Sequence, residues 1–445
     1  MPNIAEIAES QLDDPAYLKA ITELGDSVPL VTTQNLNSST GIKLVNAGTR
    51  FNSSLYNKLL QHKLVPTLDQ SLAIEDAVSN NSLAAELPTI LAEEGWLQPM
   101  LATMLNHEIF EQILTKLPLH PTAAFKLTVM RERHPGLFRR SICLTLICIY
   151  LGIRCQMDSN KLVQLATAAL LHDIGMLHID PALLAEGYTL NNAERRHLYA
   201  HPLTAWMILK KCTDYSPAVL DAVLQHHERL DGSGYPQGLA GNNISLNGQI
   251  IAVAEIITSR NGNMTSAFDK MRLEAMLKLN SRRYGRRLIG YLDVFYRSDE
   301  AVPACTDAYK QLIRNQLLCT QSAFSEWEKL WDAHYQGYAT FDSINRRMLN
   351  LKMEVLDAGL APLDIDESLD GIEDSPRACF EMHILLDEVI WQLQSVLDEI
   401  RRRWPDINGE GPASCAIHIL NWINATEQNI KSNKLTNPAG KSRGK

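Results

Sequence analysis

The sequence lacks several features that would place it in a specialised class of protein. No CxxC pair occurs among its eight cysteines, most of which lie in apolar segments, so we expect buried thiols in a reducing compartment and no disulfide framework. The longest mainly apolar stretch, residues 142–153, has 12 residues, whereas a membrane-spanning helix needs about 20. The first residues are acidic and have no apolar secretory core. These absences predict a cytoplasmic protein with no membrane insertion.

Basic charge is not concentrated anywhere in the chain. The formal net charge is −9, and the lysines and arginines form no long run. A nucleic-acid polymer is therefore not an expected partner, although a local pocket could still bind one small anion. The 445 residues exceed one typical core and predict two or three domains, and no internal repeat is present.

The pattern of apolar and polar residues divides the chain into three regions. Residues 1–118 begin with a polar helical start, followed by short β-branched runs broken by Asn, Ser and Gly, and then by helices. Residues 119–300 show helical periodicity throughout. Residues 301–445 are again helical, with a basic tail, residues 432–445, that we expect to be disordered. The predicted fold is mainly α: a helical bundle with a small α/β N-terminal module and a helical C-terminal region.

The C-terminal region contains an acidic stretch and a long apolar stripe. Residues 364–374 include six Asp or Glu among eleven residues and are expected to form an exposed linker. The helix that begins at Ser375-Pro376 carries apolar residues at spacings of four and three, namely Met382, Leu386, Val389, Leu393, Val396 and Ile400. We favour packing of this stripe within a bundle over a homodimer contact, because intrachain packing is the commoner fate of such stripes.

Local signals mark the helix ends of the middle region. Ser159 or Asn160 is expected near the start of a helix that ends before Gly175. Asn191 and Glu194 have the spacing of a capping box. Ser216 is expected to cap a helix whose first residue is a proline.

Six of the 13 histidines fall between residues 172 and 227. Five candidate ligands lie at or near the ends of three predicted helices and a sixth lies inside a fourth: His172, Asp173, His201, His226, His227 and Glu255. Metal sites in helical proteins are assembled in this way from imidazole and carboxylate groups on successive helices. Such ligands suit divalent ions such as iron and manganese, and no cysteine fits the pattern.

The adjacency of His226 and His227 indicates two ions rather than one. Neighbouring helical residues diverge by about 100°, so the two rings do not easily share one ion. They can reach two ions about 3.5–4 Å apart, with the Asp173 carboxylate bridging them. A pair of ions lowers the pKa of a bridging water and binds both oxygens of an in-line displacement at phosphorus. Hydrolysis of a phosphodiester is the reaction class that this arrangement favours.

Each of these residues, taken alone, also has a purely structural interpretation. A single buried histidine usually satisfies a backbone carbonyl, and roughly one in five would be a ligand. His178 and His197 are assigned to that class. Asp173 could simply end its helix, and His201-Pro202 could be a turn. Chance nevertheless explains poorly why HD, HP, HHE and DGSGYP occur in order, each at a helix end or turn.

These motifs together resemble the HD-GYP family of the HD phosphohydrolase superfamily. The matching segments are LLHDIG at 170–175, HP at 201–202, QHHERLDGSGYPQGL at 225–239 and the helix ending in IIAVAE. The resemblance covers about 130–165 residues of the middle region. Residues 46–65 are also similar to an N-terminal module often joined to such domains.

The resemblance implies hydrolysis of cyclic di-GMP to pGpG or GMP in second-messenger signalling, with iron or manganese in a site of two or three ions. By position, His172 and Asp173 are the catalytic HD pair and ligands, with Asp173 bridging, and His201 and the His-His pair complete the ligand set. The loop that supports the site comprises Asp231, Gly232, Gly234, Tyr235 and Pro236. Its glycines would permit a tight loop with positive φ.

The sequence also departs from the family pattern. Met176 stands where the family has lysine, Ala205 replaces a glycine, and Glu255 replaces the closing aspartate. No Arg-Pro-Tyr follows, and Arg260 is the nearest basic residue. His134 lies near the position of an upstream family histidine but about two residues out of register, so a third metal is not expected.

The metal ligands are thus retained while substrate-contacting positions are changed. Two hypotheses follow, an active cyclic di-GMP phosphodiesterase and a degenerate, non-catalytic ligand sensor or interaction scaffold. We favour the enzyme, because two-metal chemistry depends first on the ligands of the ions. A third interpretation, an HD hydrolase acting on another phosphoester, is disfavoured by the GYP loop.

Overall fold

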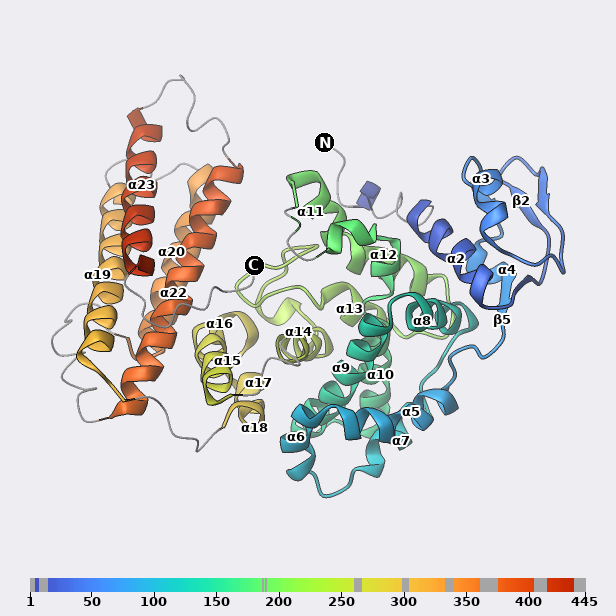
Figure 1. Cartoon of the computed structure of the whole chain (residues 1–445), viewed down its shortest axis with the longest axis horizontal. Coiled ribbons are helices and arrows are strands. Elements are labelled where there is room, and N and C mark those ends of the chain that lie inside the picture. The colour runs from blue at the N-terminus through green and yellow to red at the C-terminus, as the bar shows by residue number, and fades with distance from the viewer. Residues whose placement is uncertain are drawn as a thin grey trace. The chain divides into compact units, whose positions relative to one another are not determined.

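The structure is a computed structural model that describes residues 5–7, 15–185, 188, 190–259, 266–297, 304–332, 339–360, 375–403 and 414–435. It is mainly helical with a few short strands, as the sequence predicts (Figure 1). The chain divides into two compact units. Unit 1 comprises Met1–Asn261 with Arg283–Phe295, and unit 2 comprises Gly262–Arg282 with Tyr296–Lys445. The division into 1–118, 119–300 and 301–445 stays a prediction.

Unit 1 begins with the predicted small α/β module. Its elements are α2 (Pro15–Ser27), β1 (Leu30–Thr32), β2 (Leu36–Ser38), β3 (Lys43–Val45), the 3₁₀ helix η1 (Ser53–Leu55), α3 (Tyr56–Leu59), β4 (Leu64–Val65), α4 (Leu68–Ser71) and β5 (Leu72–Ile74). The strands form two small antiparallel sheets, β1 with β5 and β3-β2-β4. Leu30 opposes Ile74 and Thr32 opposes Leu72, and both β1 residues are buried, so the alternating pattern turns one face inward.

The remainder of unit 1 is helical. Its elements are α5 (Asn80–Glu93), η2 (Gly95–Leu97), α6 (Gln98–Ala102), α7 (Glu108–Leu114), α8 (Pro121–Arg133), α9 (Pro135–Arg154), α10 (Ser159–Leu171), η3 (Ile174–His178), η4 (Pro181–Leu184), α11 (Asn192–Tyr199), α12 (His201–Lys210), α13 (Pro217–Gln225), η5 (Gly241–Asn243), α14 (Leu246–Thr258) and α17 (Arg286–Gly290). The short helices α16 (Ser281–Tyr284) and α18 (Asp293–Tyr296) flank α17 in the chain.

Helix α9 is the core helix of unit 1. Within the described residues it is the one helix long and apolar enough to cross a membrane, since the helix continues on both sides of the 12-residue apolar run. Every residue from Ser141 to Gly152 is buried, and α9 packs against α8, α10 and α14. A buried core helix meets the same criteria of length and composition.

The helix ends of the middle region agree closely with their sequence signals. The capping box of Asn191 and Glu194 is present, and α13 begins at Pro217. Ser216 is at the N-cap position of α13, but its side chain makes no capping hydrogen bond, so that part of the prediction is wrong. The cap of α10 was predicted one or two residues too late. Asp158, not Ser159 or Asn160, is extended and accepts a hydrogen bond from the Lys161 N–H.

Unit 2 is built from α15 (Ala267–Leu279), α19 (Asp307–Leu330), α20 (Ala339–Asp357), α22 (Pro376–Arg403) and α23 (Ser414–Leu435). The predicted apolar stripe of α22 lies in the core of this unit, and α22 contacts the other four helices. Helix α23 continues to Leu435, so the first four residues of the predicted disordered tail are helical. The rest of that tail and the acidic stretch 364–374 lie outside the described residues.

Unit 2 also contradicts one prediction about the cysteines. Cys305 and Cys379 form a disulfide that joins the segment before α19 to the first turn of α22. Their 74-residue separation has no local signature, so only the packing of the helices brings the two sulfurs together. The other described cysteines with free thiols are mostly buried, as expected.

Candidate metal centre

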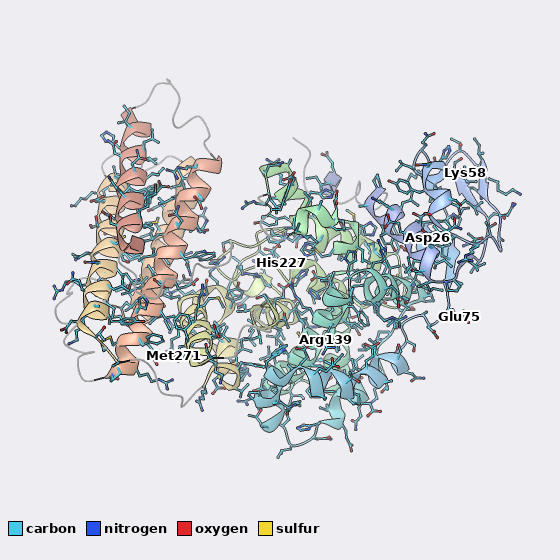
Figure 2. The ribbon with its side chains drawn as sticks, viewed as in Figure 1. Asp26, Lys58, Glu75, Arg139, His227 and Met271 are labelled. Atoms are coloured by element: carbon cyan, nitrogen blue, oxygen red, sulfur yellow. A yellow bond between two sulfur atoms is a disulfide. The ribbon has the colours of Figure 1, made fainter. Side chains whose placement is uncertain are left out.

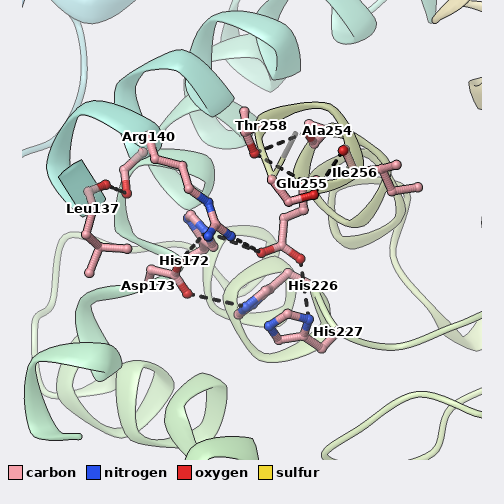
Figure 3. Close-up of polar contacts among 12 residues, drawn as sticks. Leu137, Arg140, His172, Asp173, His226, His227, Ala254, Glu255, Ile256 and Thr258 are labelled. Atoms are coloured by element: carbon pink, nitrogen blue, oxygen red, sulfur yellow. Dashed lines mark hydrogen bonds and ion pairs between the residues drawn. The ribbon is translucent and has the colours of Figure 1, made fainter. Parts of the chain in front are cut away.

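All six predicted ligands meet in one largely buried cluster of unit 1, which we call the metal centre. Figure 3 labels five of them: His172, Asp173, His226, His227 and Glu255. His172 and Asp173 directly follow α10, His201 opens α12, the His-His pair directly follows α13, and Glu255 lies inside α14. Two ligand groups result, His172–Asp173–Glu255 and His201–His226–His227, and in each group the ligand atoms lie within 4.8 Å of one another. In Figure 2, His227 lies among the central helices, away from Asp26 and Lys58 of the α/β module.

Backbone carbonyls fix the tautomer of three of the imidazoles. In each case Nδ1 faces the carbonyl of the residue three positions earlier, at 2.7 Å for His172, 2.8 Å for His201 and 2.6 Å for His226. Because a carbonyl only accepts hydrogen bonds, Nδ1 must carry the proton. The Nε2 lone pair of each ring is therefore available to a metal, and the second-shell carbonyl sets its direction.

The Asp173 carboxylate lies between the two ligand groups. Its Oδ2 is 3.1 Å from Nε2 of His172, and its Oδ1 is 3.3 Å from Nε2 of His201 and 3.9 Å from that of His226. One oxygen thus faces each group. This is the arrangement that a carboxylate bridging two ions requires.

Glu255 lies across the cluster from Asp173. Its Oε1 is 3.8 Å from Nε2 of His172, and its Oε2 is 3.3 Å from Nδ1 of His227. The Arg140 guanidinium is 3.3 Å from Oε1 and partly balances this carboxylate (Figure 3). The longer side chain of glutamate, compared with the family aspartate, still reaches the cluster.

Burial and neighbouring charges shift the pKa values of the cluster. Burial, with the nearby imidazoles, holds the pKa of His226 and His227 well below the usual range. Burial alone would raise the pKa of Asp173, but His172 and His201 hold it well below its ordinary value. Burial raises the pKa of Glu255, opposed by His172 and Arg140. Burial lowers the pKa of His172, but the Asp173 carboxylate outweighs this effect and the pKa is raised. The cluster therefore combines an ionised Asp173 carboxylate with two imidazoles, His226 and His227, that are held neutral and can bind metal.

The cluster fits a pair of divalent cations. Nε2 of His201 and Nε2 of His226 are 3.3 Å apart, and each carries a lone pair if its Nδ1 is protonated. The buried Nε2 of His172 has no hydrogen-bond partner of acceptable geometry despite its proximity to Asp173. Cations placed between these nitrogens and the carboxylates would satisfy all of them.

The predicted loop Asp231–Pro236 supports His227. Tyr235 is stacked on His227, with ring centroids 4.6 Å apart, and on Tyr199 at 4.2 Å. Gly232 has a φ of +77°, as the sequence predicts for a glycine of this loop. Gly234 is needed for a different reason, because an added Cβ would lie 2.5 Å from the carbonyl oxygen of His227.

Two further supports of the loop come from carboxylates. Glu228, the last residue of the HHE motif, is buried and accepts hydrogen bonds from the N–H of Gln237 (2.6 Å) and Leu239 (2.9 Å). Asp231 accepts one from the N–H of Ser233 at 3.0 Å. Glu228 was missed as a supporting residue, although its place in the motif was a signal for it.

Arg140 was also missed, and no sequence signal distinguished it from Arg139. The two arginines are adjacent on α9, but Arg139 pairs with Glu93 and Glu94 while Arg140 alone faces Glu255. His134 caps the junction of α8 and α9 and belongs to neither ligand group. Arg260 lies outside the described residues. His178 is buried in a second polar cluster, described below.

The region that contains this site is similar to known proteins. Residues 125–287 match the HD domain family. The chain is 29% identical over 149 residues to the cyclic di-GMP phosphodiesterase PA4108 of Pseudomonas aeruginosa, covering 34% of this chain and 36% of that protein. It is 43% identical over 99 residues to the 3′3′-cGAMP-specific phosphodiesterase 3 of Vibrio cholerae, covering 22% and 21%. It is 32% identical over 114 residues to the cyclic di-GMP phosphodiesterase PdeB of Borreliella burgdorferi, covering 26% and 30%.

The chain therefore spans about a fifth to a third of the length of these relatives. A buried centre of imidazoles and carboxylates on a helical scaffold defines an HD domain, a metal-dependent class. The matched region, residues 125–287, contains the HDIG, HP and HHE…GYP motifs and resembles the HD-GYP family, and the chain is similar to the cyclic-dinucleotide phosphodiesterases named above.

Proposed function

We propose that this protein is a metal-dependent phosphodiesterase that hydrolyses cyclic di-GMP in the cytoplasm. The observation that carries the proposal is the Asp173 carboxylate, which faces one ligand group with each oxygen. One ion would be held by His172, Asp173 and Glu255, and the other by the three remaining histidines with Asp173 bridging. Iron or manganese is the metal that these nitrogen and oxygen donors suit.

Bound ions would supply Lewis acidity toward the phosphodiester and lower the pKa of water. The protein's part is to hold the donors in place. The carbonyls of Ala169, Leu198 and Val223 orient three imidazoles, and Tyr235 packs on His227. Preorganised donors of this kind avoid reorganisation during the reaction.

Arg140 is the basic residue that we propose to replace the family lysine lost at Met176. Its guanidinium lies beside Glu255, and its side chain is 34% exposed, so it is accessible to a phosphate approaching the centre. We expect Arg140→Gln to lower kcat/KM about tenfold, with Arg140→Lys intermediate. Arg139→Gln is the matched neighbour and should change kcat/KM by less than about twofold. An Arg140→Gln enzyme as active as the wild type would contradict this role.

The substrate is the second part of the proposal. The chain is similar both to relatives named for cyclic di-GMP and to one named for 3′3′-cGAMP, so 3′3′-cGAMP is the second candidate. Both are cyclic dinucleotides with two phosphodiester bonds, and the product would be the linear dinucleotide or, after a second cleavage, the mononucleotide.

The decisive experiment is metal analysis of the purified full chain combined with a hydrolysis assay under reducing conditions. Cyclic di-GMP, 3′3′-cGAMP and a nucleotide monoester panel are compared with iron, with manganese and with chelator. Asp173→Ala should abolish turnover, while Asp180→Ala, which removes an exposed carboxylate at the start of η4, should retain it. Turnover by Asp173→Ala in chelator would refute the proposal. Metal binding without turnover of any substrate would favour the non-catalytic sensor instead.

The partners proposed beyond the substrate are few. We expect neither binding of a nucleic-acid polymer nor membrane insertion. A homodimer through the C-terminal helices remains a proposal. Such a contact would have to use faces other than the α22 stripe, because that stripe is buried within unit 2.

A further inference from the structure

Unit 1 contains a cavity of about 270 Å³ away from the predicted ligands, which we call the module cavity. One side is lined by the α/β module, through α2 and the segment from α3 to α4. The other side is lined by helices of the HD region, through α8, the end of η3 and α12. None of the six predicted metal ligands lines it.

The floor of the module cavity is a buried polar group, which we call the Lys126 cluster. Lys126 is fully buried, and its Nζ lies 2.9 Å from Oδ2 of Asp69 and 3.1 Å from Nε2 of His178. The Tyr17 hydroxyl donates to Asp69, the ammonium lies 3.9 Å from the Tyr17 ring centroid, and this ring stacks on His178. The buried ammonium is thus compensated by partners within the protein.

The walls and mouth of the cavity differ in chemistry. The walls are apolar, formed by Leu18, Leu59, Leu60, Leu64, Leu68 and Ile208. Basic side chains line the rest, including His62, Lys63, His120 and Lys211. Among the described lining residues Asp69 is the one acidic side chain, and it is already paired with Lys126.

This arrangement leaves a net positive potential inside the cavity. The pKa of Lys126 is lowered, first by burial, while Asp69 opposes the shift and Lys211 adds to it. The positive charge of Lys211 therefore acts on Lys126 at the floor of the cavity. An anion that lies between these two ammonium groups would be attracted to both. Lys211 is exposed, so it can also meet a ligand that enters from solvent.

We propose that the module cavity binds a small organic anion, with its apolar body against the leucine wall and its carboxylate or phosphate head near Lys211. The volume is just below the usual range of about 300–1,000 Å³ for ligand pockets, which favours a compact ligand. Because the α/β module and the HD region each supply part of the lining, the ligand would contact both. The proposal does not depend on the reaction proposed above.

The test measures binding of defined probes to the purified full chain by isothermal titration calorimetry. Octanoate and phenyl phosphate carry an anionic head on an apolar body, and octylamine is the cationic counterpart of octanoate. We expect one saturable site for at least one of the anions and none for octylamine. Binding of octanoate alone would identify a carboxylate site, and binding of phenyl phosphate alone a phosphate site.

Two variants locate the site within the cavity. Lys211→Gln should weaken binding of the anion about fivefold. Its neighbour Lys210 does not line the cavity and lies over the Trp206 ring, so Lys210→Gln should bind like the wild type. Leu60→Trp adds bulk at a lining residue that is 42% exposed, and should abolish binding while the circular dichroism spectrum is unchanged.

The proposal is overturned if neither anion binds, or if octylamine binds as tightly as octanoate. It is also overturned if Lys211→Gln and folded Leu60→Trp both bind the anion as the wild type does.

Discussion

Unit 1 contains two buried polar clusters, and their buried polar groups are compensated in opposite ways. In the Lys126 cluster an ammonium and a carboxylate lie 2.9 Å apart, and a tyrosine and a histidine complete the contacts. In the metal centre, imidazole nitrogens face one another at 3.3 Å, and the buried His172 Nε2 has no hydrogen-bond partner. In the Lys126 cluster, donors and acceptors of the protein pair with one another. In the metal centre, added cations would be needed to pair with the nitrogen and oxygen atoms.

This difference separates a structural polar cluster from a ligand-binding one more clearly than burial does. Lys126, His172 and His226 are all fully buried, so burial alone does not distinguish them. What distinguishes them is whether donors meet acceptors within the protein. The comparison predicts that the Lys126 cluster contributes to stability without metal, and that the metal centre contributes mainly when ions are bound.

The largest expected effect is the loss of the ammonium from the Lys126 cluster. Lys126→Met leaves the Asp69 carboxylate, whose side chain is only 11% exposed, without its ammonium partner, and breaking a buried pair in this way costs about 3–5 kcal/mol in free energy of unfolding. Urea denaturation followed by circular dichroism measures it. The double variant Lys126→Met/Asp69→Leu should recover much of the loss. A single variant within about 1 kcal/mol of the wild type would show that the pair is dispensable.

The metal centre should show the reverse behaviour. Manganese at about 100 times its Kd should raise the stability of the wild type by about 2.7 kcal/mol. Asp173→Asn removes the charge that faces both ligand groups and should abolish most of this gain. Lys126→Met should keep the full manganese gain. Thermal unfolding with manganese and with chelator gives all the values, and equal gains in Asp173→Asn and wild type would contradict the bridging role.

The two clusters also differ in how far the sequence could predict them. Each ligand of the metal centre belongs to a short motif or a strongly periodic helix, so local patterns were sufficient to nominate all six. Tyr17, Asp69, Lys126 and His178 come from four distant segments and share no motif. Only the packing of α2 and α4 on α8 and η3 brings them together. His178 was accordingly assigned to the histidines that only satisfy a backbone carbonyl.

The same distinction between local sequence patterns and tertiary packing explains the smaller differences between the predictions and the structure. The capping box of Asn191 and Glu194 depends on two residues three positions apart, and the start of α13 depends on Pro217 alone, so both could be predicted from the sequence. Asp158 was missed in favour of Ser159 because all of these residue types can cap, and the backbone conformation decides between them. The Cys305–Cys379 disulfide and the Arg140–Glu255 contact depend on tertiary packing, which composition and spacing do not report.

A moderate pH effect should arise in the metal centre. The pKa of His226 is held well below its ordinary value of about 6.5, chiefly by burial. Below pH 6.5 the unfolded chain therefore binds a proton that the folded chain does not, and the metal-free protein loses stability as pH falls. His226→Gln should remove about 1–2 kcal/mol of this loss between pH 6.5 and pH 5. Urea titrations at both pH values measure it, and an unchanged slope would mean that His226 is protonated in the fold.

The smallest expected effect is a coupling between the two clusters through η3. Asp173 directly precedes this five-residue 3₁₀ helix, and His178, its last residue, lines the module cavity. Gly175 fixes η3 against α12, because an added Cβ would lie 2.1 Å from the carbonyl oxygen of His201. A displacement of His178 by an anion in the cavity would therefore be transmitted to the carboxylate that faces both ligand groups.

We expect saturating octanoate or phenyl phosphate, whichever binds, to change the manganese Kd by about two- to fivefold, and manganese to change the Kd of that anion by the same factor. Titration of each ligand in the presence of the other measures both factors. Lys211→Gln weakens only the binding of the anion. A higher anion concentration should therefore be needed to reach the same maximal change in the manganese Kd. Unequal factors would expose a third site, and two factors of one would show that η3 is too rigid to connect the clusters.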